Sequence, residues 1–205
     1  MKLLLASNNA KKRAEFLPFL GKLDLEIVTP ADIGGIPEVV EDRPTFRENA
    51  AKKAVSAARH SGLLALADDS GLEVDHLHGE PGVRSARWAG VHGDDAANNR
   101  LLVERLRGVP LHRRGARFLC ALALARPDGT ILLEVSGSAR GRILDSPCGA
   151  RDFGYDPYFL FTEDGFPQTD KGFAEMTPDE KSRVSHRGRA LRELARRLPD
   201  VLKNA

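Results

Sequence analysis

Cysteine is scarce in this chain, and its few occurrences form no pattern. The 205 residues include only Cys120 and Cys148, too few for the disulfide framework of a small secreted protein and without the paired spacing of a zinc site. Long apolar runs are lacking as well, since the N-terminal run Met1–Ala6 is too short for a signal peptide or a membrane span. We therefore expect a reduced, cytoplasmic protein with no membrane partner.

An excess of one charge is also lacking. The formal net charge of +2 gives no strong electrostatic case for binding nucleic acid, so no nucleic-acid partner is expected. What is present is the composition of an ordinary globular protein, with 41% hydrophobic and 29% charged residues. The length suits one domain, or one large and one small lobe, and is enough to bury a substantial core.

Hydrophobic spacing and turn residues predict a mixture of strands and helices. The segments expected to form strands are Leu3–Ala6, Leu25–Val28, Leu63–Ala67, Arg117–Ala125 and Thr130–Val135. The segments expected to form helices are Ala10–Leu20, a stretch capped by Thr45–Glu48, Asp94–Arg107, and a stretch from Thr177 toward Leu198 with a possible interruption at Gly188. This order favours an α/β or α+β protein with a mixed sheet.

Two adjacent carboxylates, Asp68 and Asp69, follow the expected strand Leu63–Ala67. At the tip of a buried strand they would repel each other and lose hydration, so a cation or a hydrogen-bond network must offset that cost. Mg²⁺ prefers carboxylate oxygens and typically uses one or two of them together with substrate phosphates. The same residues also fit a solvated turn in which one aspartate caps the next segment.

A polar loop, Ser7–Lys12, joins an expected strand to an expected helix. Free backbone N–H groups and the positive end of the helix dipole meet at such a turn. Its hydroxyl, two side-chain amides and two lysines would suit a phosphate chain, although the glycines of a P-loop are absent. An asparagine-rich turn with a serine cap and solvated lysines is the alternative.

Three further segments carry candidate chemistry. Glu41 lies in a polar loop, and Lys53 lies beside an alanine-rich stripe of the following helix, from which it could reach inward or extend to solvent. In Phe153–Pro157 a glycine between two aromatics predicts a close backbone approach beside a surface for stacking on a base, or else core packing with a turn. Lys181–Gly188 offers several hydrogen-bond donors on a helix face, which could equally be solvated.

Together these segments resemble the inosine triphosphate pyrophosphatase family, which hydrolyses non-canonical purine nucleoside triphosphates. The resemblance runs from Leu5 to about Leu191, and the order and spacing of its motifs are far more specific than any one of them. Its six blocks are Ala6–Lys12, Thr45–Ala50, Ala67–Leu72, Pro81–Arg87, Phe153–Pro157 and Lys181–Gly188. Asn8 and Asp152 stand where the family often has glycine, which bears on substrate preference and rate rather than on reaction class.

The resemblance implies an α/β fold with a central mixed sheet, flanking helices and two lobes around a nucleotide cleft, formed by a single domain of residues 1–205. It implies a homodimer and the Mg²⁺-dependent hydrolysis of a purine nucleoside triphosphate (ITP, dITP or XTP) to the monophosphate and pyrophosphate. Trp88, the only tryptophan, could anchor a subunit interface, although core packing is the more common role of such a residue.

The resemblance also implies roles by motif position. Asp69 and Glu41 would act around the metal, and Asp69 would be the proton acceptor. Ser70 would contact substrate, and Lys53 would reach phosphate. The triphosphate would be held by Ser7, Asn8, Asn9, Ala10, Lys11 and Lys12. The base and sugar would be held by Phe153, Gly154, Tyr155, Asp156, Lys181, His186 and Arg187.

Two other functions remain open. A phosphohydrolase that forms an aspartyl-phosphate at Asp68 or Asp69 would favour an Asp-x-Asp opening after the strand, whereas here the two acids are adjacent. A non-catalytic nucleotide sensor would bind nucleotide without releasing pyrophosphate. For the enzyme, Lys181 and Arg187 would prefer the carbonyl of a 6-oxo purine to the amino group of adenine, because their side chains only donate hydrogen bonds.

Overall fold

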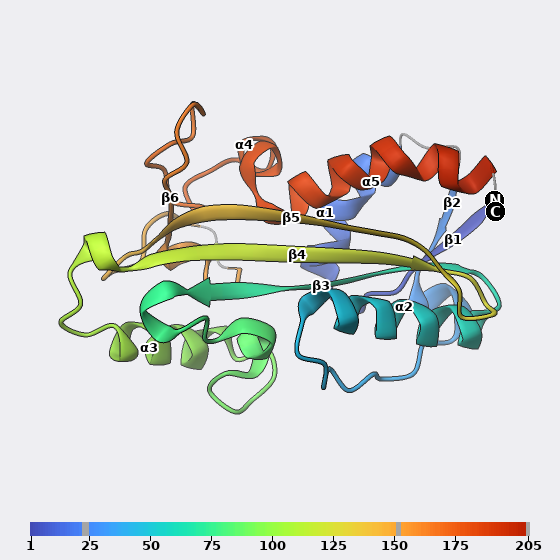
Figure 1. The fold of residues 1–205 in the computed structure, drawn as a ribbon, viewed down its shortest axis with the longest axis horizontal. Coiled ribbons are helices and arrows are strands. Elements are labelled where there is room, and N and C mark those ends of the chain that lie inside the picture. The colour runs from blue at the N-terminus through green and yellow to red at the C-terminus, as the bar shows by residue number, and fades with distance from the viewer. Residues whose placement is uncertain (22–24, 151–152, 204–205) are drawn as a thin grey trace. The chain divides into compact units, whose positions relative to one another are not determined.

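The structure, a computed structural model, describes residues 1–21, 25–150 and 153–203; Asp152 lies outside these residues. The strands are β1 (Lys2–Leu5), β2 (Glu26–Val28), β3 (Leu64–Val74), β4 (Gly115–Ala125), β5 (Ile131–Ile143) and β6 (Phe159–Phe161) (Figure 1). The helices are α1 (Ala10–Leu20), α2 (Phe46–Ser61), α3 (Asp95–Arg105), α4 (Pro178–Val184) and α5 (His186–Lys203). Within the described ranges, no helix combines the length and the apolar character needed to cross a membrane.

The strands form one sheet, and the chain divides into two compact units. The strand order is β2-β1-β3-β4-β5-β6. β1 pairs in parallel with β2 and β3, whereas β5 pairs antiparallel with β6, so the sheet is mixed and the expected α/β class is confirmed. Unit 1 comprises Met1–Asp69, Cys120–Gly137 and Arg187–Ala205, and unit 2 comprises Ser70–Leu119 and Ser138–His186.

In unit 1, α1 and α5 cover one face of the strands (Figure 1). Phe16 and Leu20 of α1 and Leu191 and Leu194 of α5 form a buried cluster with leucines of the strands. The buried strand leucines in this cluster are Leu3, Leu5, Leu66, Leu122, Leu124 and Leu133. They occupy alternate positions, as expected for side chains that point to one face of a sheet. Each such leucine stabilises the fold by about 1.5–3 kcal/mol through burial.

The opposite face of the unit 1 strands is covered by α2 (Figure 1), and many of the buried side chains on this face are alanines. Buried alanines of this face include Ala65 and Ala67 of β3, Ala121 and Ala123 of β4, and Ala50, Ala54, Ala57 and Ala58 of α2. Alanines on both sides let the helix backbone approach the sheet closely, as small residues do wherever elements pack tightly. A long side chain at the edge of this stripe, such as that of Lys53, therefore lies close to β3.

Unit 2 is built around an aromatic core. The ring centroid of Phe118 in β4 lies 4.7 Å from that of Phe159 in β6, and the Phe118 ring stacks on Phe173 at 5.7 Å. Trp88 belongs to the same core and is 8% exposed. Trp88 thus packs in the core, the more common role of such a residue, and gives no support for a subunit interface.

Several element boundaries differ from those expected from the sequence; β5, for example, continues to Ile143 instead of ending at Val135. Two of the differences bear on the candidate site. β3 does not end at Ala67 but continues through both aspartates to Val74, because fully buried Leu72 and Val74 give the strand a second apolar stretch. The C-terminal helical region breaks at Ser185, whose backbone is extended, and not at Gly188. Gly188 lies buried inside α5, where tertiary packing overrides its low helix propensity.

Candidate active site

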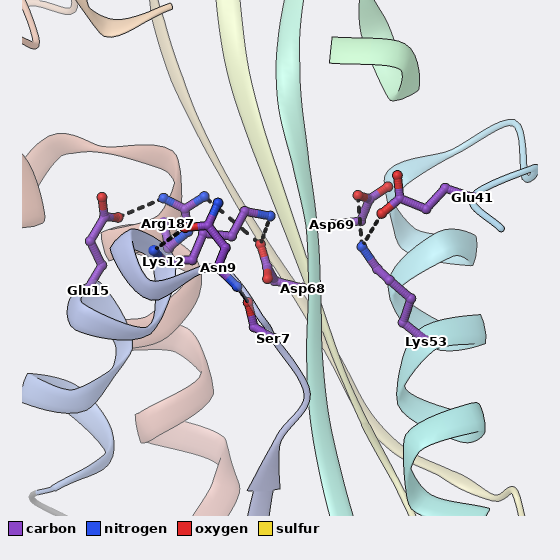
Figure 2. A network of polar contacts seen from close by, with 9 residues as sticks. All are labelled: Ser7, Asn9, Lys12, Glu15, Glu41, Lys53, Asp68, Asp69 and Arg187. Carbon is purple, nitrogen blue, oxygen red and sulfur yellow. Dashed lines mark hydrogen bonds and ion pairs between the residues drawn. The ribbon is translucent and has the colours of Figure 1, made fainter. Parts of the chain in front are cut away.

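β3 presents its two aspartates on opposite faces (Figure 2). Because strand side chains alternate, Asp68 points to the same face as Leu66, and Asp69 points to the same face as Ala67. Both are buried, at 4% and 5% exposure, which rules out the solvated turn. Each carboxylate meets its own lysine rather than its neighbour. Ser70 follows in the strand and is half-buried.

Asp68 is the centre of a buried ion network in unit 1 (Figure 2). Its Oδ2 accepts a hydrogen bond from Lys12 Nζ at 2.8 Å and lies 3.9 Å from Arg187 Nη2. Arg187 donates in turn to Glu15 at 2.7 Å, so charges tie α1, β3 and α5 together. Burial acts to raise the pKa of the Asp68 carboxyl, but Lys12 and Arg187 outweigh it and hold that pKa well below its usual range.

Arg187 has partners other than those expected. The resemblance implies a contact with the base and sugar, whereas the structure places this side chain, 2% exposed, beside Glu15 and Asp68. Burial works against the charged guanidinium, but Glu15 and Asp68 raise the pKa of Arg187 above its usual range. A contact of Arg187 with substrate stays a prediction.

Caps order the loop between β1 and α1. Asn9 is the N-cap of α1, and its Oδ1 accepts the Lys12 N–H at 3.0 Å. Ser7 is buried, and its Oγ accepts the Asn9 N–H at 3.3 Å. The exposed residues of the loop are Asn8, Asn9, Ala10 and Lys11. The six residues expected to hold phosphate thus gather at one helix N-terminus, where the helix dipole favours an anion.

On the α2 side of β3, Lys53 links two carboxylates (Figure 2). Its Nζ donates to Glu41 Oε1 at 2.7 Å and to Asp69 Oδ1 at 3.1 Å. Burial works against the ammonium, but the surrounding carboxylates raise the pKa of Lys53 nevertheless. Burial together with Glu41 outweighs the attraction of Lys53 and raises the pKa of Asp69 to about 6. Lys53 therefore reaches inward, and its extension to solvent is ruled out.

Asp69 Oδ2 is buried without a hydrogen-bond partner in the part of the chain that the structure describes. An orphaned carboxylate oxygen beside a second carboxylate, Glu41, fits a hard divalent cation such as Mg²⁺. The same described ranges contain no group of three or more His, Cys, Asp or Glu side chains placed to hold a metal ion. A cation at this position would therefore complete its ligands with phosphate oxygens and water.

The loop that carries Glu41 is held on α2 by Asn49 and Lys52, neither of which is among the site residues expected from the sequence. Asn49 is fully buried; it accepts the Arg43 N–H at 3.0 Å and donates to the Arg43 carbonyl at 3.4 Å. Lys52 donates to the backbone carbonyl that precedes Glu41, at 2.8 Å. One helix thus positions both Lys53 and the carboxylate that it binds. The spacing of Asn49 and Lys53, four residues apart, was the available signal.

In unit 2, four of the residues expected at the base lie in two groups of contacts. Lys181 Nζ donates a short hydrogen bond to Asp156 Oδ2 and lies 5.2 Å from the centroid of the Phe153 ring. His186 stacks on Phe118, with 4.7 Å between the ring centroids. Lys181 therefore contacts both Phe153, the expected stacking residue, and Asp156, the expected hydrogen-bond acceptor.

The glycine turn on this side is held by α3, which the sequence did not connect with it. The Gly154 N–H donates to Asp95 Oδ2 at 2.9 Å, and Asn99 Nδ2 donates to the Gly154 carbonyl at 2.9 Å. The Tyr155 hydroxyl donates to the Ser85 carbonyl at 2.9 Å. These partners are 55 to 70 positions apart in the sequence, so no local pattern could have linked them.

Comparison with known proteins gives matches along nearly the whole chain. The model of the Ham1 family matches residues 3–197, which confirms the resemblance drawn from the six motifs. A relative from Corynebacterium efficiens, named dITP/XTP pyrophosphatase, is 48% identical over 198 residues, covering 95% of each chain. A relative of the same name from Syntrophobacter fumaroxidans is 50% identical, covering 98% of this chain and 83% of its own.

Solved structures match the fold as well. A HAM1 protein from Coxiella burnetii superposes with a TM-score of 0.86 at 37% identity, covering 98% of this chain and 99% of that one. A nucleoside-triphosphatase / dITP/XTP pyrophosphatase from Mycobacterium abscessus gives a TM-score of 0.75 at 47% identity, covering 95% and 97%. Sequence and structure therefore point to the same family.

Proposed function

This chain belongs to the Ham1 family, and we propose that it hydrolyses non-canonical purine nucleoside triphosphates (ITP, dITP and XTP) to the monophosphate and pyrophosphate. The observation that carries the proposal is the group formed by buried Asp69 with half-buried Glu41 and Lys53, in which one carboxylate oxygen of Asp69 has no partner among the described residues. The names of the relatives, dITP/XTP pyrophosphatase, support the same substrate class.

The triphosphate is proposed to bind unit 1. Ser7–Lys12 supplies the N-terminus of α1, and Lys12 and Lys53 supply positive charge against the phosphates. A triphosphate is densely anionic, so neutralisation by such groups is the main task in breaking its anhydride bond. Lys53 now binds Glu41 and Asp69, so it has to share or exchange these partners when phosphate enters.

Glu41 and Asp69 are proposed to hold Mg²⁺, since the orphaned Asp69 Oδ2 and the neighbouring carboxylate suit a hard cation. When bound, the cation supplies positive charge against the triphosphate as the bond breaks. Lys53, which donates to both carboxylates, would then share their neutralisation with the cation. Asn49 and Lys52 keep Glu41 in place through the loop backbone.

Asp69 is the proposed proton acceptor. Water attacks the α-phosphorus, the bond from that phosphorus to the bridging oxygen breaks, and pyrophosphate leaves while Asp69 takes a proton from the water. Without a bound cation, burial and Glu41 raise the pKa of Asp69 to about 6. A cation held by the same carboxylate would lower that pKa, so the proposed acceptor is ionised at neutral pH and ready to take a proton from water.

The base is proposed to bind unit 2, with Phe153 as the stacking surface and Lys181 as a donor to a 6-oxo group. Asp156 fixes the Lys181 ammonium by hydrogen bond. Adenine presents an amino group at position 6, which would face this donor without a partner. Ser70, Gly154, Tyr155, His186 and Arg187 remain proposed substrate contacts.

The test is a panel of ITP, dITP, XTP, GTP and ATP with Mg²⁺ and separate detection of pyrophosphate and orthophosphate. We expect pyrophosphate from the first three and a preference over ATP of roughly 10⁴-fold, the range of a site built around a hydrogen bond. Orthophosphate as the first product, with ¹⁸O from water entering an aspartate carboxylate, would instead indicate an aspartyl-phosphate enzyme. Tight binding of ITP without any hydrolysis would indicate a nucleotide sensor.

We further propose that the protein is a homodimer in the cytoplasm. The family resemblance motivates the dimer, and the two free cysteines suit a reducing compartment. Light scattering at micromolar concentration is expected to give twice the mass of one chain. A mass of one chain at that concentration would contradict the dimer.

A further inference from the structure

Gly154 is held from both of its backbone groups by one face of α3. Its N–H donates to Asp95 Oδ2 and its carbonyl accepts from Asn99 Nδ2, both at 2.9 Å. Asp95 and Asn99 are four residues apart and therefore neighbours on the helix surface. Two directed hydrogen bonds to the same residue fix both the position and the orientation of that peptide segment.

The backbone at Gly154 needs such a restraint. Its φ is +56°, in the left-handed region, which glycine enters freely but does not prefer over its other conformations. An added Cβ would meet nothing within 4 Å, so the glycine serves the backbone conformation and not a close approach. Without external bonds this turn would sample several conformations, and the ring of Phe153 beside it would move with it.

α3 is itself well anchored at the end that makes these bonds. Asp94 caps the helix by accepting the Ala97 N–H at 2.9 Å. Asn98 is buried and accepts the Ala89 N–H at 2.8 Å. The side chains that hold Gly154 thus project from a fixed support.

We propose that Asp95 and Asn99 are positioning residues for purine recognition, because they lock the Gly154 turn and thereby place Phe153 beside Lys181. This inference rests on the proposed function. Phe153 precedes the locked residue, and the Lys181 ammonium lies 5.2 Å from its ring centroid. Asp156 follows the same turn and binds Lys181, so one turn sets the place of both the stacking ring and the acceptor that orients the donor.

The test compares three variants with the wild type. Asp95→Ala removes the acceptor, and Asn99→Asp keeps the shape while replacing the donating amide by a carboxylate that cannot donate. Asp95→Asn is the matched control, because it removes the charge but retains an acceptor oxygen. We expect the first two variants to raise KM for ITP roughly tenfold, as for a lost hydrogen bond, with little change in kcat. Asp95→Asn is expected to remain close to the wild type.

A second measurement separates the base from the phosphates. Tripolyphosphate, which lacks a base, is expected to inhibit all four proteins with the same inhibition constant. A rise in that constant in parallel with KM, or an unchanged KM in both Asp95→Ala and Asn99→Asp, would overturn the inference. Equal losses in Asp95→Asn and Asp95→Ala would show that the charge in the first helical turn matters, and would overturn it too.

Hydrogen exchange of the Gly154 amide tests the lock without any turnover. The exchange is expected to be faster in Asp95→Ala than in Asp95→Asn and the wild type, and equal rates would contradict the lock itself. If the wild type does not release pyrophosphate from ITP, the proposed function fails, and the exchange result still decides whether the Gly154 lock exists.

Discussion

An Asp69→Asn variant is expected to lose turnover of ITP by at least roughly 10²–10⁴-fold, the usual value of a general base. Asparagine keeps an oxygen that can accept from Lys53, but it cannot take a proton from water, and it removes the negative charge from the proposed cation site. The measurement is kcat for pyrophosphate release at saturating Mg²⁺ and ITP. Asp164→Asn, at an exposed position, is the control and is expected to keep full activity.

The same variant is expected to be no less stable than the wild type at pH 7.5. The folded-state pKa of Asp69 is raised from 3.8 to about 6. The folded state therefore binds this proton more tightly than the unfolded state, and the resulting stabilisation is present below pH 3.8 and is lost as pH rises through about 6. Above that pH the ionised, buried carboxylate opposes folding, and asparagine removes this opposition.

Near-wild-type turnover of ITP by folded Asp69→Asn would contradict the role of Asp69 as proton acceptor.

An Asp68→Asn variant is expected to fail in a different way, by losing about 3 kcal/mol of the free energy of unfolding. Removing one partner from a buried ion pair typically costs 3–5 kcal/mol because the remaining charge is left uncompensated. The lower end applies here, since Arg187 retains Glu15 at 2.7 Å. Lys12 is 20% exposed and can turn toward water. Urea denaturation at pH 7 measures the loss.

The loss of stability in Asp68→Asn is expected to depend on pH. The pKa of Asp68 is lowered in the folded state, so its contribution is present above pH 3.8 and is lost as pH falls through the folded-state pKa. The deficit of Asp68→Asn should therefore shrink in acid. Asp200→Asn, whose pair with Lys203 is 80% exposed on the aspartate side, is the control and is expected to change stability little. A deficit that is independent of pH would point to packing instead of charge.

Local features of this fold were predictable from the sequence because their causes are local. The bounds of α1 were predicted as they are found, and Thr45 and Thr177 cap α2 and α4 because the capping side chain lies three residues from the N–H that it accepts. The sequence does not decide whether Lys53 reaches inward or extends to solvent, since its partners Glu41 and Asp69 depend on how closely α2 packs on the sheet.

Long-range contacts were the part that the sequence could not supply. Glu15 and Arg187 are 172 positions apart. Nothing in the sequence around either residue distinguishes a buried ion pair from two solvated charges. The lock on Gly154 likewise joins α3 to a turn 55 positions later. The opposite orientation of Asp68 and Asp69 was missed for a simpler reason. Ending the strand at Ala67 removed the alternation that would have separated them.

The alternation of β3 makes the chemistry of this site depend on whether a residue number is odd or even. Each side chain of a strand points to one face of the sheet or to the other. A single deletion between Leu64 and Asp68 would therefore turn Asp69, the partner of Lys53, to the face covered by α1. Only insertions or deletions of an even number of residues in this segment would keep both aspartates on their present faces. In the turn around Gly129, between β4 and β5, one residue more or less would leave both aspartates where they are.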